Sequence, residues 1–244
     1  MTSIPRRLGP NRSHHLMSSD SRPERHREIC VYCAKNPGVT GDHVPPKSFF
    51  PQPRPSNLIT VPACNKCNSG AGKDEDYFLA TFMFSEAGIT DAGKILWKQR
   101  LHRMFRKNLG LRRKIAKGLS YRSVVTPTGI YLGRRMALQS DERRFDRVVR
   151  KIVRGLYYFE YGEALPTETE VMTLFLSTKA RFETAVGHAH QLAWGKRQWP
   201  GIFEYRCGRV PGAPKGSVWL MRCYSNTHFW AISGSDEVLN EDGG

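Results

Sequence analysis

Residues 30–76 read CVYCAKNPGVTGDHVPPKSFFPQPRPSNLITVPACNKCNSGAGKDED, and this stretch decides how the N-terminal part of the chain folds. Each end of it carries a Cys-x-x-Cys pair, formed by Cys30 and Cys33 and by Cys64 and Cys67. Two thiolates at this spacing can bind a metal ion from one tight turn, and two such turns complete a tetrahedral site. Sulfur ligands and four-coordination favour zinc. Because four thiolates leave no coordination position open, we predict a structural zinc ion that holds the two ends of a long irregular loop.

Four polar side chains lie between the cysteine pairs or directly after them, and they are the candidates for chemistry: Asp42, His43, Asn57 and Asn68. The order Cys-x-x-Cys, Asp-His-Val-Pro-Pro-Lys, Ser-Asn-Leu, Cys-x-x-Cys-Asn resembles the HNH, or ββα-metal, endonuclease family in its zinc-bearing, four-cysteine form. The resemblance covers about one fifth of the chain. It implies a nuclease core of two strands and a helix, in an H-N-N variant, because Asn68 stands at the last family position, where His is common.

The resemblance also implies a role for each of these residues. His43 matches the family's first His, which acts as the general base, and Asn57 matches the middle Asn, which orients the loop that carries this base. Asp42 and Asn68 then hold a catalytic Mg²⁺ or Mn²⁺. General chemistry agrees, since Mg²⁺ prefers oxygen ligands and usually takes one or two of them from the protein. A neutral imidazole, with an ordinary pKa near neutrality, suits the removal of a proton from the attacking water.

Positive charge is concentrated in one segment of the chain. Nineteen Lys or Arg residues and three acidic residues lie between Lys94 and Arg154, so this segment carries the whole formal net charge of +16. Such an excess, interleaved with aromatic residues, predicts a polyanionic partner, which we take to be DNA, with RNA as the alternative. A solvated helical face is the simpler explanation for most basic runs, but here a nuclease-like stretch adjoins the segment. The residues expected to contact phosphates are Lys47, Lys73, Arg112, Arg113, Arg143 and Arg147.

The hydrophobic pattern predicts an α+β fold with an N-terminal zinc-stapled ββα-metal nuclease core, a basic helical region and a C-terminal antiparallel β-rich region. We expect a disordered basic arm over residues 1–27, because this part is rich in Ser, Pro, Arg and His and poor in apolar residues. A zinc-bearing nuclease domain is then expected over 28–90, and a basic α+β domain that holds and targets DNA over 91–244.

Individual elements are predicted from periodicity and from turn residues. Apolar residues at helical spacing predict a helix from Asp141 to about Tyr161, with arginines on its other faces. We expect Asp74 to be the N-cap of an earlier helix, with Glu75 in its first turn. These roles explain both residues more simply than metal binding does. Gly110 is expected to divide a basic helical stretch. The remaining expectations are that helical stretch over 91–119, a hairpin over 124–132, a helix over about 167–188, and strands over 202–207, 217–224 and 228–233.

Composition excludes several classes of protein. The sequence has no run of eighteen apolar residues, which excludes a membrane span, and its basic N-terminus lacks the apolar core of a secretory signal. Six cysteines, four of them in metal-type pairs, indicate a reducing, cytoplasmic location. The other two, Cys207 and Cys223, are expected to be small apolar residues of strands.

The leading hypothesis is therefore a metal-dependent DNA endonuclease, a phosphodiester hydrolase in which His43 activates water beside a Mg²⁺ ion held by Asp42 and Asn68. The alternative is a non-catalytic, zinc-stapled nucleic-acid-binding protein, which needs neither the Asp42-His43 pair nor Asn68. A third hypothesis is an effector nuclease that a partner activates. The sequence specifies neither the target nor the oligomeric state, because basic residues position nucleic acid without identifying its sequence.

Overall fold

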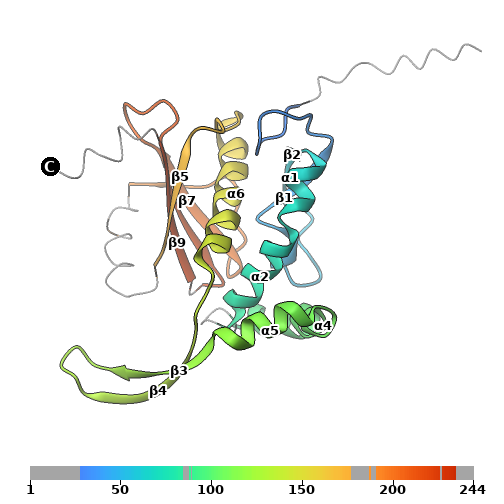
Figure 1. The fold of residues 1–244 in the computed structure, drawn as a ribbon. Coiled ribbons are helices and arrows are strands. Elements are labelled where there is room, and N and C mark those ends of the chain that lie inside the picture. Colours follow the sequence, from blue (N-terminus) through green and yellow to red (C-terminus); the bar gives the residue numbers. More distant parts are fainter. Residues whose placement is uncertain are drawn as a thin grey trace, which may run out of the picture.

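The computed structural model describes residues 28–84, 88, 90–176, 187, 191–225 and 227–234 (Figure 1). Within these residues the chain consists of helices and of three antiparallel sheets, two of them two-stranded and one five-stranded. This confirms the predicted α+β class and the antiparallel C-terminal region. The predicted arm over 1–27 lies outside the described residues. None of the described helices has the length and the apolar composition that a membrane span requires.

The first sheet is a pair of short antiparallel strands, β1 (Thr40–Val44) and β2 (Ile59–Ala63). β1 ends at Pro45 and Pro46, because proline lacks the N–H group that a further ladder hydrogen bond would need. One 3-10 turn, η1 (Lys47–Phe49), then leads into the proline-rich loop that returns to β2. The apolar side chains of both strands are buried, so this small sheet forms part of the core.

Two helices follow β2 almost without a break, α1 (Asn65–Gly70) and α2 (Gly72–Met83). Helix α1 begins directly after Cys64, whose sulfur accepts a hydrogen bond from the backbone N–H of Cys67 and so caps the helix. Helix α2 begins at Gly72, two residues before Asp74, so the predicted N-cap at Asp74 is wrong. Asp74 lies in the first turn of α2, and its carboxylate pairs with arginines of a later helix.

A run of short helices occupies the predicted basic helical stretch. Thr90 caps the first of them by accepting a hydrogen bond from the backbone N–H of Gly93 at 3.1 Å. Asn108 divides the last two, because its side chain accepts a hydrogen bond from the N–H of Leu111 at 2.9 Å. The division is therefore at Asn108 and not at the predicted Gly110. The elements are α3 (Asp91–Leu96), the π-helical turn η3 (Trp97–Leu101), α4 (His102–Lys107) and α5 (Leu109–Gly118).

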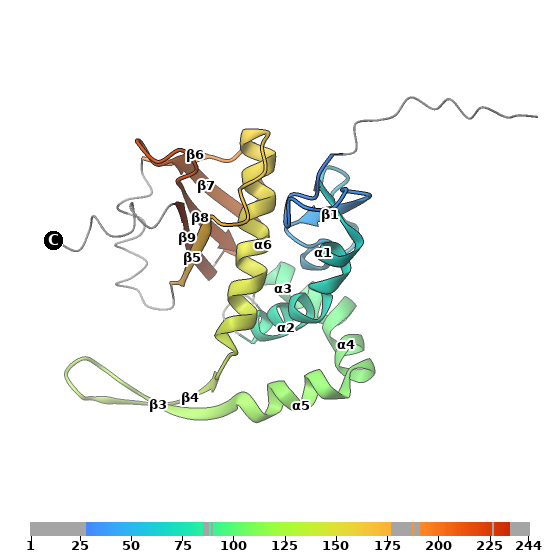
Figure 2. The same cartoon turned by 45° about the horizontal axis from the view of Figure 1, so that its top comes forward.

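The predicted hairpin is present as β3 (Leu119–Val125) and β4 (Tyr131–Leu138), joined by a turn that begins at Thr126. It extends away from the body of the molecule (Figure 1, Figure 2). Most of its side chains are exposed, and even the large apolar residues Tyr121 and Leu132 have 72% and 64% of their surface exposed. The hairpin therefore adds little to the core.

The predicted long helix is α6 (Glu142–Tyr161), which ends at Gly162 in the left-handed conformation. It packs on a five-stranded antiparallel sheet in the order β5-β9-β8-β7-β6. The strands β7, β8 and β9 confirm the three predicted C-terminal strands. The sheet consists of β5 (Glu170–Phe175), β6 (Ala193–Trp194), β7 (Phe203–Arg209), β8 (Ser217–Cys223) and β9 (Thr227–Gly234).

The helix predicted over 167–188 is wrong for residues 170–175, which form β5. These residues pair with β9 in an antiparallel ladder, and Thr173 donates a hydrogen bond to Asp146 of α6. Pairing with a strand that lies far along the chain thus outweighs the local helical pattern. Most of the remainder of the predicted helix lies outside the described residues.

Helix α6 lies between the five-stranded sheet and the N-terminal strands and helices (Figure 1, Figure 2). Its buried residues, such as Val153 and Leu156, belong to one hydrophobic cluster that runs from Val31 to Ala231. The segments 28–84 and 90–234 therefore share a core among the described residues, rather than having one each.

Gly155 marks a close approach of α6 to the N-terminal sheet. A Cβ atom at this position would lie 2.4 Å from Cγ2 of Val44 on β1, and Val44 itself is buried. Only glycine therefore permits this helix–strand distance without a shift of one element.

Replacing Gly155 by Ala should destabilise the fold, because the new Cβ atom would lie 2.4 Å from Cγ2 of the buried Val44. Overpacking of this kind lowers the free energy of unfolding by about 1–3 kcal/mol. Gly70→Ala is the matched control, since a Cβ atom at Gly70 meets nothing within 4 Å. Urea titrations followed by circular dichroism measure both variants, and equal stabilities would show that α6 does not approach β1 so closely.

Candidate functional site

The two Cys-x-x-Cys pairs come together in one cluster, formed by Cys30, Cys33, Cys64 and Cys67. Their sulfur atoms all lie within 4.8 Å of one another, and the Sγ atoms of Cys33 and Cys64 are 4.0 Å apart. In a tetrahedral site with zinc–sulfur bonds of about 2.3 Å, the sulfur atoms are about 3.8 Å apart. The four cysteines are therefore close enough to bind a metal ion such as zinc. In the part of the chain that the structure describes, no other group of three or more His, Cys, Asp or Glu side chains could do so.

Hydrogen-bond donors lower the pKa of Cys33 and of Cys64 in the cluster, whereas burial raises the pKa of Cys67. The backbone N–H of Lys35 is the main cause that lowers the pKa of Cys33 to about 6. Nδ2 of Asn36 lies 3.7 Å from Sγ of Cys33 and 3.9 Å from Sγ of Cys64. Because the thiolate is the form that binds metal, these donors favour metal binding at Cys33 and Cys64.

A cavity of about 530 Å³ lies where β1 ends and α2 begins, and we call it the β1 cavity. Its lining includes Asp42 and His43 from β1 and Asn68 from α1, so three of the four predicted site residues share one cavity. Two of the residues predicted to contact phosphates, Lys47 and Lys73, also line it. Further charged residues of its wall are Arg54, Glu75, Asp76 and Arg100.

Asp42 is buried, with 8% of its surface exposed. Its Oδ1 accepts a hydrogen bond from the backbone N–H of His43 at 3.0 Å. Its Oδ2 lies 2.8 Å from Nζ of Lys151 on α6, although the angle does not make this contact a hydrogen bond. One buried carboxylate oxygen thus has an ion-pair partner but no hydrogen bond among the described residues.

His43 is half-buried, one residue before the end of β1. Burial is the main cause that lowers its pKa below the ordinary value of 6.5, and the nearby Lys47 lowers it further. The Asp42 carboxylate offsets this only in part. The imidazole is therefore neutral at physiological pH, which is the form that can accept a proton.

The side-chain amide of Asn68 is held in one orientation. Its Nδ2 donates hydrogen bonds to Oγ1 of Thr40 at 3.0 Å and to the carbonyl oxygen of Gly41 at 3.3 Å. Thr40 Oγ1 donates its own proton to the carbonyl of Ala63 at 2.8 Å, so it can only accept from Asn68. The amide oxygen of Asn68 has no hydrogen-bond partner in the described part of the chain, which leaves it available as a metal ligand.

Asn57 does not line the β1 cavity. Its Oδ1 accepts a hydrogen bond from Nε1 of Trp199 at 3.1 Å, and its backbone carbonyl accepts one from Arg197 at 3.1 Å. Asn57 therefore fixes the loop before β2 to the C-terminal part of the chain. Its expected role in orienting His43 stays a prediction.

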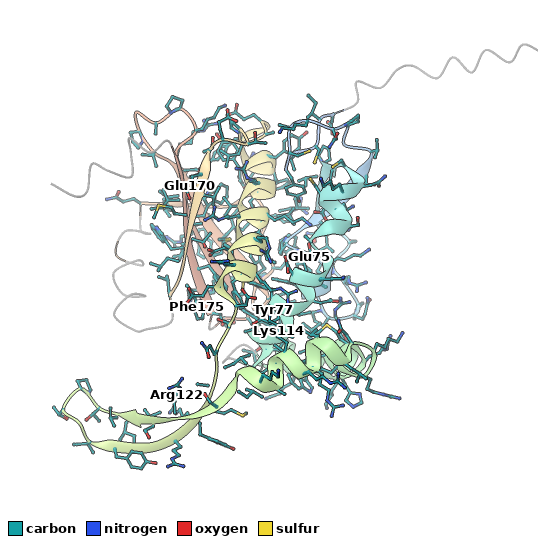
Figure 3. The ribbon with its side chains drawn as sticks, in the orientation of Figure 1. Glu75, Tyr77, Lys114, Arg122, Glu170 and Phe175 are labelled. Atoms are coloured by element: carbon teal, nitrogen blue, oxygen red, sulfur yellow. The ribbon has the colours of Figure 1, made fainter. Side chains whose placement is uncertain are left out.

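Lys151 of α6 contacts the site residues, although no sequence pattern distinguishes it. Its Nζ lies 2.8 Å from Asp42 and 2.7 Å from Oε1 of Glu75, and 5.3 Å from the ring centroid of Tyr32. Burial lowers the pKa of Lys151, but the two carboxylates outweigh this effect and raise it. Figure 3 shows Glu75 on α2 where this helix faces α6. No local pattern in α6 distinguishes Lys151 from its basic neighbours, because its partners lie far away in the chain.

The other predicted phosphate contacts lie outside the β1 cavity. Arg147 pairs with Asp74 at 2.7 Å, and Arg144 pairs with the same carboxylate at 2.6 Å. Burial acts to raise the pKa of Asp74, but the two arginines outweigh it and lower that pKa. Asp74 is therefore an ion-pair residue of the α2–α6 contact. The remaining three, Arg112, Arg113 and Arg143, are exposed.

Comparisons of this chain with protein-family models, with curated proteins and with solved structures give no match. The resemblance to the HNH family therefore stays a prediction, which rests on residues 30–76. The structure adds the shared cavity of Asp42, His43 and Asn68, and the cluster of four sulfurs.

Cys64→Ser should remove most of the bound metal, because a tetrahedral thiolate site needs all four sulfurs. Metal analysis of the purified chain is expected to find one zinc ion per molecule, and much less in this variant. The melting temperature should fall by on the order of 10 °C, as the loss of a few kcal/mol implies for a chain of this size. The control is Cys207→Ala, which changes a buried cysteine outside the cluster and should keep the metal. Equal metal contents in the two variants would show that the cluster does not bind it.

Proposed function

We propose that this chain is a metal-dependent endonuclease of the HNH type, which hydrolyses phosphodiester bonds in DNA. The observation that carries the proposal is the shared lining of the β1 cavity by Asp42, His43 and Asn68. Binding alone requires none of these three side chains in that arrangement. Lys47, Lys73 and Arg54 from the same wall suit the negative charge of a phosphodiester.

The donor set of the β1 cavity fits a hard divalent cation such as Mg²⁺ or Mn²⁺. Asp42 would offer its carboxylate, whose buried Oδ2 lies 2.8 Å from Lys151, and Asn68 would offer an amide oxygen whose orientation is fixed. A cation bound there would stabilise the charge that develops on the phosphate and on the leaving oxygen. Lys151 already lies beside Asp42, so the carboxylate would be shared between the lysine and the cation.

His43 acts as the general base in this proposal. Its neutral imidazole takes a proton from a water molecule, and the water oxygen attacks the phosphorus atom. The bond from phosphorus to the leaving oxygen breaks, and this oxygen gains a proton from solvent. Lys47 and Lys73 hold the phosphate in place, which keeps the water and the scissile bond in line.

The four-cysteine cluster holds a structural zinc ion in the same proposal. The cluster joins the turn before β1 to the start of α1, so it fixes both ends of the segment that carries Asp42 and His43. A site with four thiolates has no open position for substrate. Zinc would therefore determine shape, and the oxygen-bound cation would take part in cleavage.

A non-catalytic nucleic-acid-binding protein is the second candidate. The contact between Lys151 and Asp42 favours it, because this lysine already balances the carboxylate without any metal ion. The strongly basic composition, with a net charge of +16, agrees with both candidates. A cleavage assay separates them, since only the first predicts a chemical step.

Supercoiled plasmid DNA incubated with the wild-type chain and Mg²⁺ should be converted to the nicked form, and the reaction should stop when Mg²⁺ is omitted. His43→Ala should reduce the nicking rate by about 10²- to 10⁴-fold, because it removes the proton acceptor. His102→Ala is the control, since His102 is exposed and lies outside the β1 cavity. Nicking by His43→Ala at the wild-type rate would exclude His43 as the base, and no nicking by the wild-type chain would favour the second candidate.

The nicking rate should also depend on pH in a defined direction. The pKa of His43 is lowered, so the active neutral form is lost only when the pH falls through a value below 6.5. We expect the rate to rise with pH through a midpoint below 6.5 and to stay level above neutrality. Lys47→Gln removes a cation that lowers this pKa, so its midpoint should be higher than that of the wild-type chain. An unchanged midpoint in this variant would mean that another group sets the pH profile.

A further inference from the structure

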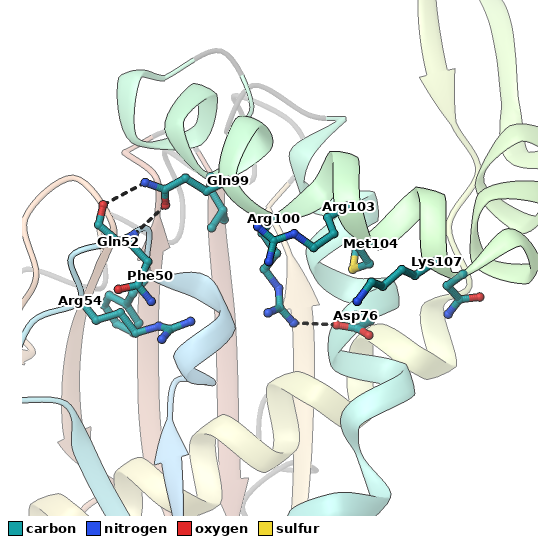
Figure 4. Close-up of a pocket in the computed structure, with 11 residues that line it drawn as sticks. Phe50, Gln52, Arg54, Asp76, Gln99, Arg100, Arg103, Met104 and Lys107 are labelled. Atoms are coloured by element: carbon teal, nitrogen blue, oxygen red, sulfur yellow. Dashed lines mark hydrogen bonds and ion pairs between the residues drawn. The ribbon is translucent and has the colours of Figure 1, made fainter.

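A second cavity, of about 520 Å³, continues from the β1 cavity, and we call it the α4 cavity (Figure 4). Three residues line both cavities: Arg54, Asp76 and Arg100. The two cavities therefore adjoin at these three side chains. The other polar residues of the α4 cavity are Gln52, Gln99, Arg103, Lys107 and Asn108.

The wall of the α4 cavity is built from two segments that are distant in the chain. Gln99 lies on the π-helical turn η3, and its side chain bonds the backbone of Gln52 twice, accepting from the N–H at 2.7 Å and donating to the carbonyl at 3.0 Å. Figure 4 shows this double contact. On the same proline-rich loop, Nε of Arg54 donates to the carbonyl of Lys47 at 3.0 Å. Arg54 is thus held at the junction of the two cavities. The π-helical turn that carries Gln99 is a feature often found at functional sites.

The α4 cavity has an excess of positive charge that the described residues do not neutralise. Four cationic side chains and one carboxylate line it, and the carboxylate of Asp76 pairs with Arg100 at 3.0 Å. Nε of Arg100 is buried without a hydrogen-bond acceptor among the described residues. Arg103 and Lys107 are exposed, and the described part of the chain provides neither of them with an acidic partner. In contrast, Arg144 of α6 is paired with Asp74 and is not free to bind an anion in the same way.

We propose that the α4 cavity binds the phosphates of the nucleic-acid strand on one side of the scissile bond. This inference rests on the proposed function, because the strand must pass through the β1 cavity for its continuation to reach Arg103 and Lys107. These two residues are four positions apart on one helix, so they lie on the same face, with Cβ atoms about 6 Å apart. Contacts of this kind position the strand and do not identify its sequence. The α4 cavity therefore sets the direction in which the strand crosses His43.

The test compares two double variants in the His43→Ala background, where binding can be measured without cleavage. Arg103→Ala with Lys107→Ala removes two charges from the α4 cavity. Lys98→Ala with Arg106→Ala removes two charges from the same helical region, at exposed positions that line neither cavity. Fluorescence anisotropy of a labelled DNA duplex gives the affinity of each protein at several salt concentrations, and circular dichroism checks that each is folded.

The cavity variant should bind DNA more weakly, and its plot of log K against log salt should be less steep by about 2, since each lost phosphate contact changes the slope by about 0.9. The control variant should keep most of the slope of the His43→Ala chain. Equal slopes for the two variants would overturn the inference, whether or not the wild-type chain nicks plasmid. Absence of DNA binding by the His43→Ala chain would overturn it as well, whereas binding without nicking by the wild-type chain would overturn only the proposed cleavage.

Discussion

One buried ammonium group, that of Lys151, connects the elements that form the site. It contacts Asp42 on β1 and Glu75 on α2 while its own backbone lies on α6, so three elements meet at one charge. All three side chains are largely buried, with 10% to 16% of their surface exposed. Removing one partner from such a buried group costs about 3–5 kcal/mol of stability, because the remaining buried charges then lack a partner of opposite sign.

Much of the positive charge of α6 has a structural role. Arg144 and Arg147 bind Asp74 of α2, and Arg154 donates hydrogen bonds to four backbone carbonyls in the turn before β5. Two cations of the short helices, Arg103 and Lys107, have no acidic partner among the described residues and line the α4 cavity. The basic segment thus contains two kinds of cation, one that joins helices and one that is available to an anionic partner.

The features that follow from local rules could be predicted from the sequence. The cysteine pairs, the hairpin and α6 each depend on residues that are close together in the chain, and the structure contains all three. Contacts between distant segments could not be predicted. The strand β5 forms because β9 pairs with it, Asn57 is bound by Trp199, and Lys151 meets carboxylates of β1 and α2. In each case the deciding partner is remote in sequence, so no spacing or periodicity reveals it.

The two ends of the β3–β4 hairpin meet at its base. The backbone N–H of Gln139 donates to the carbonyl of Gly118 at 2.9 Å, and a Cβ atom at Gly118 would lie 2.7 Å from the carbonyl oxygen of Gln139. The path from α5 to α6 would therefore be continuous without the hairpin. The hairpin is in effect an insertion at a tight junction, so its length can change without a change in the shape of the shared core.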